Sequence, residues 1–457
     1  MRAQARSRPT GRRRLASRAT RQVWPAGLHL PHHRATTAHL CSAYPFQAAR
    51  GLGGRGVYLG HDDLAGGGAF CYDPFELYTQ RIIDSPNIFV AGMPRVGKSA
   101  TWKAFLYRCV GALRSPGGMP RWCAIVDPKA EYAGLAEALG LDTVALYPGG
   151  TNRLNPLEPG PAAAWASPEE LALRRSTMLA ALLAGVLRRE LTQIEDALLS
   201  WALEDLTLSA RVGEPTLRDV AALLANPTAA MAARDALGRS TGELAQAGDH
   251  IMLALGRLLD RSLRGMFDGP STVRSNFSGR GLVIDVSAVL HDPPVLTLVM
   301  IAVTSWLQAA LAVPEGEATP RRMQVIDEAW ALLGQERTAA YFQHCWKLCS
   351  LYGVANVAIC HRISDLRSQS DDGTTTAKVA LGLLADTDTR VLFRQASDQA
   401  AEATDLLQLT LAESQLVTKL AKGRALWKVG QHHTSVVQHV LAPGERAFTD
   451  TDARLTL

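Results

Sequence analysis

The first residues that could do chemistry form the glycine-rich run Gly92–Ser99, with the sequence GMPRVGKS. It fits G-x-x-x-x-G-K-[ST], the pattern of a phosphate-binding loop. In such a loop, backbone N–H groups and the positive end of the following helix hold nucleotide phosphates. Lys98 would add a positive charge beside them, and Ser99 would offer a hydroxyl to Mg²⁺. The expected nucleotide contacts are Gly92, Met93, Pro94, Arg95, Val96, Gly97, Lys98, Ser99 and Ala100.

A second pair of candidate residues, Asp327 and Glu328, ends the apolar run Met323–Ile326. Asp327 would hold Mg²⁺, and Glu328 would polarise the attacking water as a general base. Kinases and small GTPases rarely have the adjacent glutamate, whereas hydrolytic motors of the RecA and AAA type usually do. Alone, the run also fits a strand that ends in a solvated turn. Together with the phosphate-binding loop, it predicts Mg²⁺-dependent hydrolysis of a nucleoside triphosphate.

Strands and helices must position these residues. Short apolar runs predict strands at 87–91, 122–127, 143–146, 282–286, 323–327, 354–360 and 390–394. Helical stretches, beginning with 100–106 directly after the loop, alternate with them. This alternation predicts an α/β fold, in which helices cover both faces of a mostly parallel sheet. Since ligands of such sheets bind at the carboxyl ends of the strands, both motifs should meet there.

The pattern changes to a helical period between about 167 and 265. Leucines recur at helical spacing from Leu179 to Leu187, and Thr192-x-x-Glu195 and Thr216-x-x-Asp219 have the form of helix starts. No strand signal appears there, so we expect an inserted all-α domain. The runs 423–430 and 434–441 predict an antiparallel hairpin at the sheet edge. The expected parts are a tail at 1–50, the halves of an ATPase core at 51–160 and 271–457, and the inserted domain at 161–270.

The positive net charge of the chain, +5, belongs to the first fifty residues. They contain ten Arg and no Lys, Asp or Glu, whereas the remainder carries 38 basic and 43 acidic side chains. Such a tail is typical of a disordered segment that contacts nucleic acid or a membrane surface. A start codon assigned too early in a GC-rich gene explains it equally well. The tail lacks the apolar run of a signal peptide.

Two features bear on where the protein works. No C-x-x-C pair occurs among the seven cysteines, which favours reduced, mostly buried thiols in a cytosolic protein: Cys41, Cys71, Cys109, Cys123, Cys345, Cys349 and Cys360. Residues 295–313 are uncharged and long enough to span a membrane. They contain four polar side chains and follow Asp292-Pro293-Pro294, a helix-start signal, so we interpret them as a buried helix. We expect a cytoplasmic protein, at most peripheral at the inner face of the cell membrane.

Several motifs together resemble one family. Asp127–Tyr132, DPKAEY, resembles the D-P-K-G-E-Y of type IV secretion and conjugation ATPases, and Leu154–Leu157 resembles their N-P-L turn. Asp327–Leu333 resembles their D-E-A-W-x-L-L, and Phe448–Asp452 resembles their C-termini. The match covers about residues 55–457. It is most similar to the VirB/TraC-type ATPases of actinobacterial conjugative elements, in the HerA–FtsK superfamily of P-loop motors.

This resemblance implies a RecA-like core, an inserted all-α domain, a homo-hexameric ring, and ATP and Mg²⁺ as cofactors. It also implies partners in a secretion or conjugation channel, with DNA or protein as cargo. The chain departs from the family at Pro94-Arg95, where relatives often have glycine, and Pro94 lacks a backbone donor. Ala130 replaces a family glycine, and the N-terminal part before the core is short.

Five further residues follow from position and analogy. His361 comes directly after the strand at 354–360, where such motors carry a polar residue that contacts the γ-phosphate; a helix-start histidine is the alternative. Arg390 or Arg394 could reach a neighbouring subunit's ATP as an arginine finger, or could form an ordinary salt bridge. Lys129, with Glu131, would lie near the nucleotide or a subunit interface, unless the two form a solvated pair.

The leading functional hypothesis is an ATP-hydrolysing motor of a conjugative transfer or type IV secretion system. A soluble DNA translocase or coupling ATPase of the FtsK/TraG kind is the main rival within motors. A third hypothesis is a scaffold that binds ATP without hydrolysing it, although Glu328 argues against this because such a scaffold has no need of a base.

Overall fold

The computed structural model describes residues 51–208, 214–273, 279–313, 319–333, 336–361 and 382–450. They belong to one compact unit, Ala49–Leu457. The Arg-rich tail and residues 451–457, which include the end of the family-like C-terminus, lie outside the described residues.

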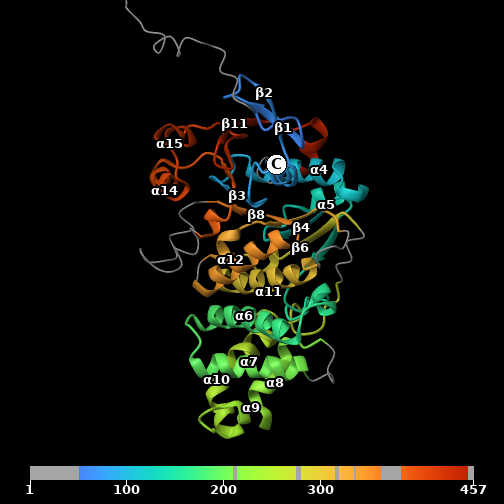
Figure 1. The fold of residues 1–457 in the computed structure, drawn as a ribbon, viewed down its shortest axis with the longest axis vertical. Helices are drawn as coiled ribbons and strands as arrows, with labels where there is room; N and C mark the ends of the chain where they lie inside the picture. Colours follow the sequence, from blue (N-terminus) through green and yellow to red (C-terminus); the bar gives the residue numbers. More distant parts are fainter. Residues whose placement is uncertain are drawn as a thin grey trace, which may run out of the picture. The chain divides into compact units, whose positions relative to one another are not determined.

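The described strands form one sheet of eleven, in the order β2-β1-β11-β10-β9-β3-β8-β7-β4-β6-β5 (Figure 1). The seven strands from β9 to β5 are parallel, and the α/β fold predicted from the sequence is confirmed. Their bounds are Thr389–Leu392 (β9), Ile88–Ala91 (β3), Val354–Cys360 (β8), Arg322–Ile326 (β7), Trp122–Asp127 (β4), Gly281–Asp285 (β6) and Asp142–Ala145 (β5).

The C-terminal hairpin forms, but its predicted place at the sheet edge is wrong. Strands β10 (Arg424–Val429) and β11 (His433–His439) pair antiparallel, and β10 continues the sheet on β9. The other side of β11 is covered by β1 (Val57–Asp62), and β2 (Gly68–Tyr72) forms the edge. The sequence analysis did not predict the first hairpin, whose strands, VYLGHD and GAFCY, are short and each contain a glycine, which weakens the strand signal.

Helices cover both faces of the sheet because its strands are apolar on both sides. Ile88 and Val90 of β3 join the core beneath α4 (Lys98–Ala112) and α5 (Ala133–Leu139), whereas Phe89 and Ala91 join the core beneath α11 and α12. Such alternation is the period-two geometry of a strand buried on both faces. The remaining helices of the sheet region are α3 (Pro74–Thr79), α11 (Pro293–Leu311), α12 (Glu336–Leu351), α14 (Ser397–Leu407), α15 (Leu411–Val417) and α16 (Arg446–Thr449).

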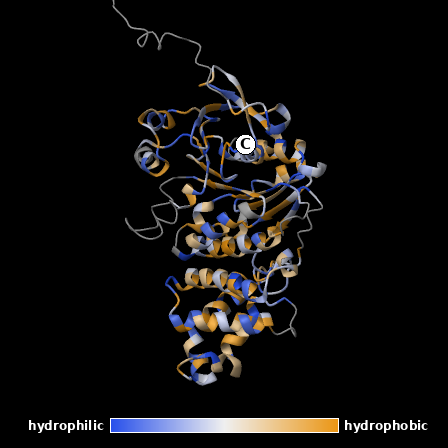
Figure 2. Ribbon diagram, in the orientation of Figure 1, coloured by the Kyte–Doolittle hydropathy of each residue, from blue (hydrophilic) through white to orange (hydrophobic). Residues whose placement is uncertain are grey.

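The stretch predicted to be helical contains no strand among its described residues. The predicted starts at Thr192 and Thr216 are confirmed, since each hydroxyl accepts the N–H three residues on, at 3.4 Å. The helix α6 packs on α11 and α12, with apolar side chains on both sides of the contact (Figure 2). The helices are α6 (Pro168–Leu187), α7 (Gln193–Leu208), α8 (Leu217–Ala225), α9 (Ala229–Arg234) and α10 (Thr241–Arg257). We keep the domain division as a proposal.

Helix α11 carries the uncharged segment long enough to cross a membrane. It is the one such helix found among the described residues, and 83% of its apolar window is buried inside the protein. Asp292 caps it by accepting the Val295 N–H at 3.2 Å. Its apolar side chains pack on the sheet and on α6, which is the arrangement of a core helix.

Candidate nucleotide-binding and hydrolysis site

The glycine-rich loop joins the end of β3 to the start of α4, which is the strand–loop–helix order that phosphate binding needs. Gly97 precedes the helix at φ 104°, a conformation that favours glycine. At Gly92 a Cβ atom would lie 2.5 Å from Cβ of Phe393, so only glycine fits there. The loop is tied at both ends, because Met93 N donates to Arg394 O at 2.9 Å and Gly423 N donates to Val96 O at 2.8 Å.

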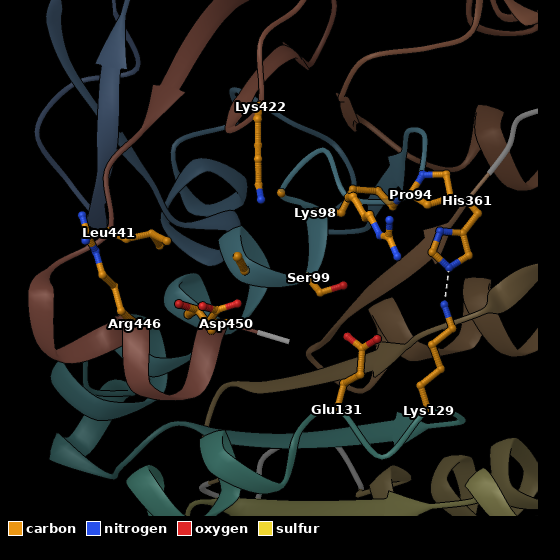
Figure 3. Close-up of a pocket in the computed structure, with 14 residues that line it drawn as sticks. Pro94, Lys98, Ser99, Lys129, Glu131, His361, Lys422, Leu441, Arg446 and Asp450 are labelled. Carbon is orange, nitrogen blue, oxygen red and sulfur yellow. Dashed lines mark hydrogen bonds between the residues drawn. The ribbon is translucent and has the colours of Figure 1, made fainter. Parts of the chain in front are cut away.

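The loop residues divide into those that face a cavity and those that face the protein. Pro94, Arg95, Gly97, Lys98, Ser99 and Ala100 line a cavity of about 520 Å³ (Figure 3). Gly92, Met93 and Val96 do not line it, although the sequence placed them among the nucleotide contacts. Val96 is buried in the core, and the Met93 N–H is already donated to Arg394. Since Pro94 has no N–H, we expect phosphate contacts from the second half of the loop.

Lys98 is the first residue of α4, and it is only 4% exposed. Its Nζ donates to the carbonyl oxygens of Gly92 and, at 2.7 Å, of Met93. Burial lowers the pKa of Lys98 to about 8, against the opposing charges of Asp327 and Glu328. A phosphate would supply the negative charge that this buried ammonium group lacks.

The acidic pair follows β7, which is separated from β3 by β8 alone. Asp327 is 3% exposed and accepts a hydrogen bond from the Tyr132 hydroxyl at 3.4 Å. Burial, and then the neighbouring Glu328 carboxylate, raise the pKa of Asp327. A buried carboxylate of this kind is a suitable ligand for a divalent cation, and together with the Ser99 hydroxyl it offers the oxygen donors that Mg²⁺ prefers.

Glu328 is the centre of a cluster that we name the Glu328 cluster: Lys129, Glu328, Trp330 and His361. Its Oε1 contacts Nε2 of His361 at 2.5 Å and the Nζ of Lys129, and its Oε2 accepts from Nε1 of Trp330. Burial alone would raise the pKa of Glu328, but His361 and Lys129 outweigh it and hold that pKa at about 2. The carboxylate is therefore charged and held at a fixed place.

Three strand ends bring this cluster together. Lys129 follows β4, Glu328 follows β7 and His361 follows β8, and these strands are neighbours in the order β8-β7-β4. His361 thus comes directly after β8, as predicted, and β8 pairs with the strand that carries the acidic pair, β7. Glu328 itself has φ 54°, and its side chain contacts both Lys129 and His361. Such a conformation is strained for a non-glycine residue and is common at functional sites.

The loop after β4 is held by Asp127, whose two carboxylate oxygens accept from Lys129 N at 3.0 Å and Tyr132 N at 2.9 Å. Lys129 and Glu131 from this loop line the cavity, as expected for residues near the nucleotide. Glu131 lies 3.7 Å from the fully buried Lys103 of α4, and burial lowers the pKa of Lys103. Figure 3 shows the Glu131 carboxylate on the side of the cavity that Ser99 faces.

The C-terminal part of the chain closes the cavity on the other side. Lys422 precedes β10, Leu441 follows β11, and α16 with its flanks contributes Arg446, Thr449 and Asp450. The motifs did not single out Lys422, Leu441 or Arg446, whereas Thr449 and Asp450 belong to the family-like run Phe448–Asp452, to which the sequence assigned no role in the site. The backbone hydrogen bond between Gly423 and Val96 places this part of the chain beside the phosphate-binding loop. A contact between residues more than 300 positions apart has no local sequence signal.

The two candidate arginine fingers differ in surroundings. Arg390 on β9 is half-buried and donates to the carbonyl oxygens of Leu384 at 3.0 Å and Leu407, the last residue of α14, at 3.4 Å. Arg394, two residues after the end of β9, is exposed, and its carbonyl oxygen accepts the N–H of the loop residue Met93. Arg390 therefore holds two carbonyl groups within its own chain, whereas Arg394 has a side chain on the surface beside the phosphate-binding loop.

Comparison with solved structures shows the same fold in VirB4 and in the conjugative coupling protein TrwB. VirB4 of Thermoanaerobacter pseudethanolicus is similar over 87% of this chain and 99% of its own, with a TM-score of 0.67 and 21% identity. The plasmid coupling protein TrwB with the ATP analogue ADPNP is similar over 78% of this chain and 85% of its own, with a TM-score of 0.53 and 18% identity. TrwB with ADP and Mg²⁺ gives 0.51 and 16%. No protein-family model and no curated protein matches the sequence.

Proposed function

We propose that this chain is an ATP-hydrolysing motor of a conjugative transfer or type IV secretion system, which couples ATP turnover to the movement of DNA or protein. One observation carries the proposal. A phosphate-binding loop and an Asp-Glu pair lie at the carboxyl ends of β3 and β7, which only β8 separates, beside a cavity of about 520 Å³, in a fold shared with VirB4 over nearly the whole of that protein. A TrwB structure with ADP and Mg²⁺ supports the choice of cofactors.

In this proposal each residue has one task. Loop N–H groups and Lys98 hold the phosphates, and Ser99 and Asp327 would hold Mg²⁺, which supplies positive charge to the phosphate oxygens. Glu328 takes a proton from the attacking water, whose oxygen forms a bond to the terminal phosphorus as the bond to ADP breaks. His361, in contact with Glu328, would report the state of the terminal phosphate.

Two substitutions test the hydrolysis assignment. Lys98→Ala should abolish nucleotide binding or hydrolysis, because it removes the buried cation of the loop. Glu328→Gln should leave ATP bound but uncleaved, because an amide cannot accept the proton. Steady-state phosphate release and equilibrium binding of labelled ATP by the full chain measure both. Hydrolysis by Glu328→Gln at the wild-type rate would show that the base is another group.

The assembly and the location stay part of the proposal. We infer a homo-hexamer that docks on channel components from the cytoplasmic side, at the inner face of the cell membrane. The likeness to TrwB, a conjugative coupling protein, favours a second candidate, a coupling ATPase that moves DNA itself.

Adding double-stranded DNA to the ATPase assay separates the two candidates. Several-fold stimulation would support the DNA translocase. A low rate that DNA does not change would support a secretion motor that becomes active on its channel partners. The experiment needs two controls, which account for contaminating nucleases and ATPases. They are the wild-type chain without DNA and the Lys98→Ala chain with DNA.

A further inference from the structure

The Glu328 carboxylate is separated from the nucleotide cavity by two of its own partners. Lys129 and His361 line the cavity, where Figure 3 shows the hydrogen bond between them, and both contact Glu328 Oε1. Glu328 is 2% exposed and is not among the lining residues. Its other oxygen accepts from Trp330. Any water in the cavity therefore meets Lys129 and His361 before it meets Glu328.

A base must lie within about 2.6–3.2 Å of the water whose proton it takes. With its Nζ against Oε1, Lys129 occupies the approach to the carboxylate from the cavity side. His361 contacts the same oxygen, but its side chain has only two rotatable bonds, and its backbone lies at the end of β8, so its ring has little freedom to move. Lys129 has a four-carbon chain and is the more mobile of the two partners. Water can reach Glu328 most simply if Lys129 moves.

The backbone of Lys129 is held by Asp127, whereas its side chain is held by its contacts with Glu328 and His361. Its N–H donates to Asp127, and Tyr132 N–H ties the other end of the loop to the same carboxylate. The side chain is 27% exposed, so it already touches the cavity. The titratable groups around it are Glu328, Asp327 and Glu131 on the acidic side, and Lys98 and His361 on the basic side.

A terminal phosphate held by Lys98 and Ser99 would add an anion to the cavity that Lys129 lines. A phosphate offers more charge and more acceptor oxygens than one carboxylate does. A diphosphate would lack this group at the end that lies toward Glu328. The terminal phosphate of a bound triphosphate would therefore attract the Lys129 ammonium group away from Glu328. A bound diphosphate would not.

We propose that Lys129 exchanges the Glu328 carboxylate for the terminal phosphate of a bound nucleoside triphosphate, and that this exchange opens Glu328 to the attacking water. The inference rests on the proposed function and assigns to the loop after β4 a direct part in telling triphosphate from diphosphate. A merely structural ion pair between Lys129 and Glu328 would make no such distinction.

The test is the binding of a non-hydrolysable ATP analogue and of ADP, each with Mg²⁺, to the full chain. Lys129→Met should weaken binding of the analogue by about tenfold or more and binding of ADP by less than about twofold, since only the analogue offers the terminal phosphate. Lys129→Arg should recover part of the loss. Lys419→Met, which removes an exposed lysine that does not line the cavity, is the matched control.

A second variant keeps the test informative if Lys129→Met is poorly folded. Glu328→Gln removes the charge that competes for Lys129, so it should tighten binding of the analogue several-fold without changing binding of ADP. In the double variant with Lys129→Met this gain should vanish. Equal losses for both nucleotides in Lys129→Met, or the same gain with and without Lys129, would overturn the exchange. If the wild-type chain binds neither nucleotide, the proposed function fails instead.

Discussion

At the scale of single residues, backbone strain gathers around the nucleotide cavity. Six described non-glycine residues have positive φ, and three of them belong to the loops that form the site: Arg95, Ala130 and Glu328. Each lies where a side chain or a loop must turn within one residue. Strain of this kind is maintained by the surrounding contacts, here the Asp127 hydrogen bonds and the contacts within the Glu328 cluster.

Ala130 gives a prediction about stability. It has φ 54°, a region that costs alanine about 1–2 kcal/mol, and the resembling family has glycine there. Ala130→Gly should raise the unfolding free energy by up to about 1 kcal/mol, because glycine relieves this strain and its larger loss of chain entropy, about 0.5–1 kcal/mol, offsets only part of the gain. Urea unfolding of the full chain measures it. The control Ala138→Gly, in the exposed interior of α5, should lower stability by about that entropic amount, and a loss in both variants would contradict the argument.

At the scale of elements, the C-terminal hairpin is tied to the phosphate-binding loop through His439 of β11. Nε2 of His439 accepts from the Trp427 indole at 3.1 Å, so Nδ1 carries the proton and donates to Gly423 O at 2.9 Å. Gly423 in turn donates to Val96 O. In the neutral imidazole, both ring nitrogens already take part in hydrogen bonds. A second proton, on Nε2, would point at the indole N–H of Trp427.

This arrangement predicts a loss of stability in acid. Burial lowers the pKa of His439 to about 4 from 6.5 in the unfolded chain. The stabilisation is complete above pH 6.5 and falls as the pH drops toward 4, by up to roughly 3 kcal/mol. Urea unfolding at stepped pH values measures the slope. His439→Gln should flatten it over this range, and an unchanged slope would show that other groups cause the loss.

At the scale of the whole molecule, the two candidate finger arginines differ. One is exposed at the phosphate-binding loop, and the other already makes hydrogen bonds within its own chain. Arg394 is exposed beside the phosphate-binding loop, and Arg390 donates to Leu384 and Leu407. If active sites are completed between subunits, Arg394 is the better placed of the two predicted fingers to act on a neighbour. Arg390 serves the chain's own fold.

Mixing experiments test this assignment. Arg394→Ala should lower the hydrolysis rate by about 10³-fold or more with little change in ATP binding. Mixing it with the inactive Glu328→Gln chain should restore part of the activity, because an Arg394→Ala subunit keeps its base and receives Arg394 from its neighbour. Arg390→Met should instead lower the unfolding temperature, because two carbonyl groups lose their donor. Failure of the mixture to recover any activity would exclude Arg394 as a finger.

The sequence by itself determined the parts of the site whose residues are contiguous. The loop Gly92–Ser99 and the pair Asp327-Glu328 each combine an apolar strand with polar residues at its end, and short apolar runs and helical patterns predicted the parallel sheet and the helical stretch between them. His361 could be placed because it directly follows a strand that the sequence predicted at 354–360.

Only the tertiary structure decided how distant segments meet. That β1 and β2 take the sheet edge, that Lys422 and α16 close the cavity, and that Lys129 covers Glu328 all depend on pairing between segments far apart in the chain. The free energy of such contacts comes from burial and charge that no local pattern records. A strand carries its own period in its sequence, but its neighbour in the sheet is chosen by the whole fold.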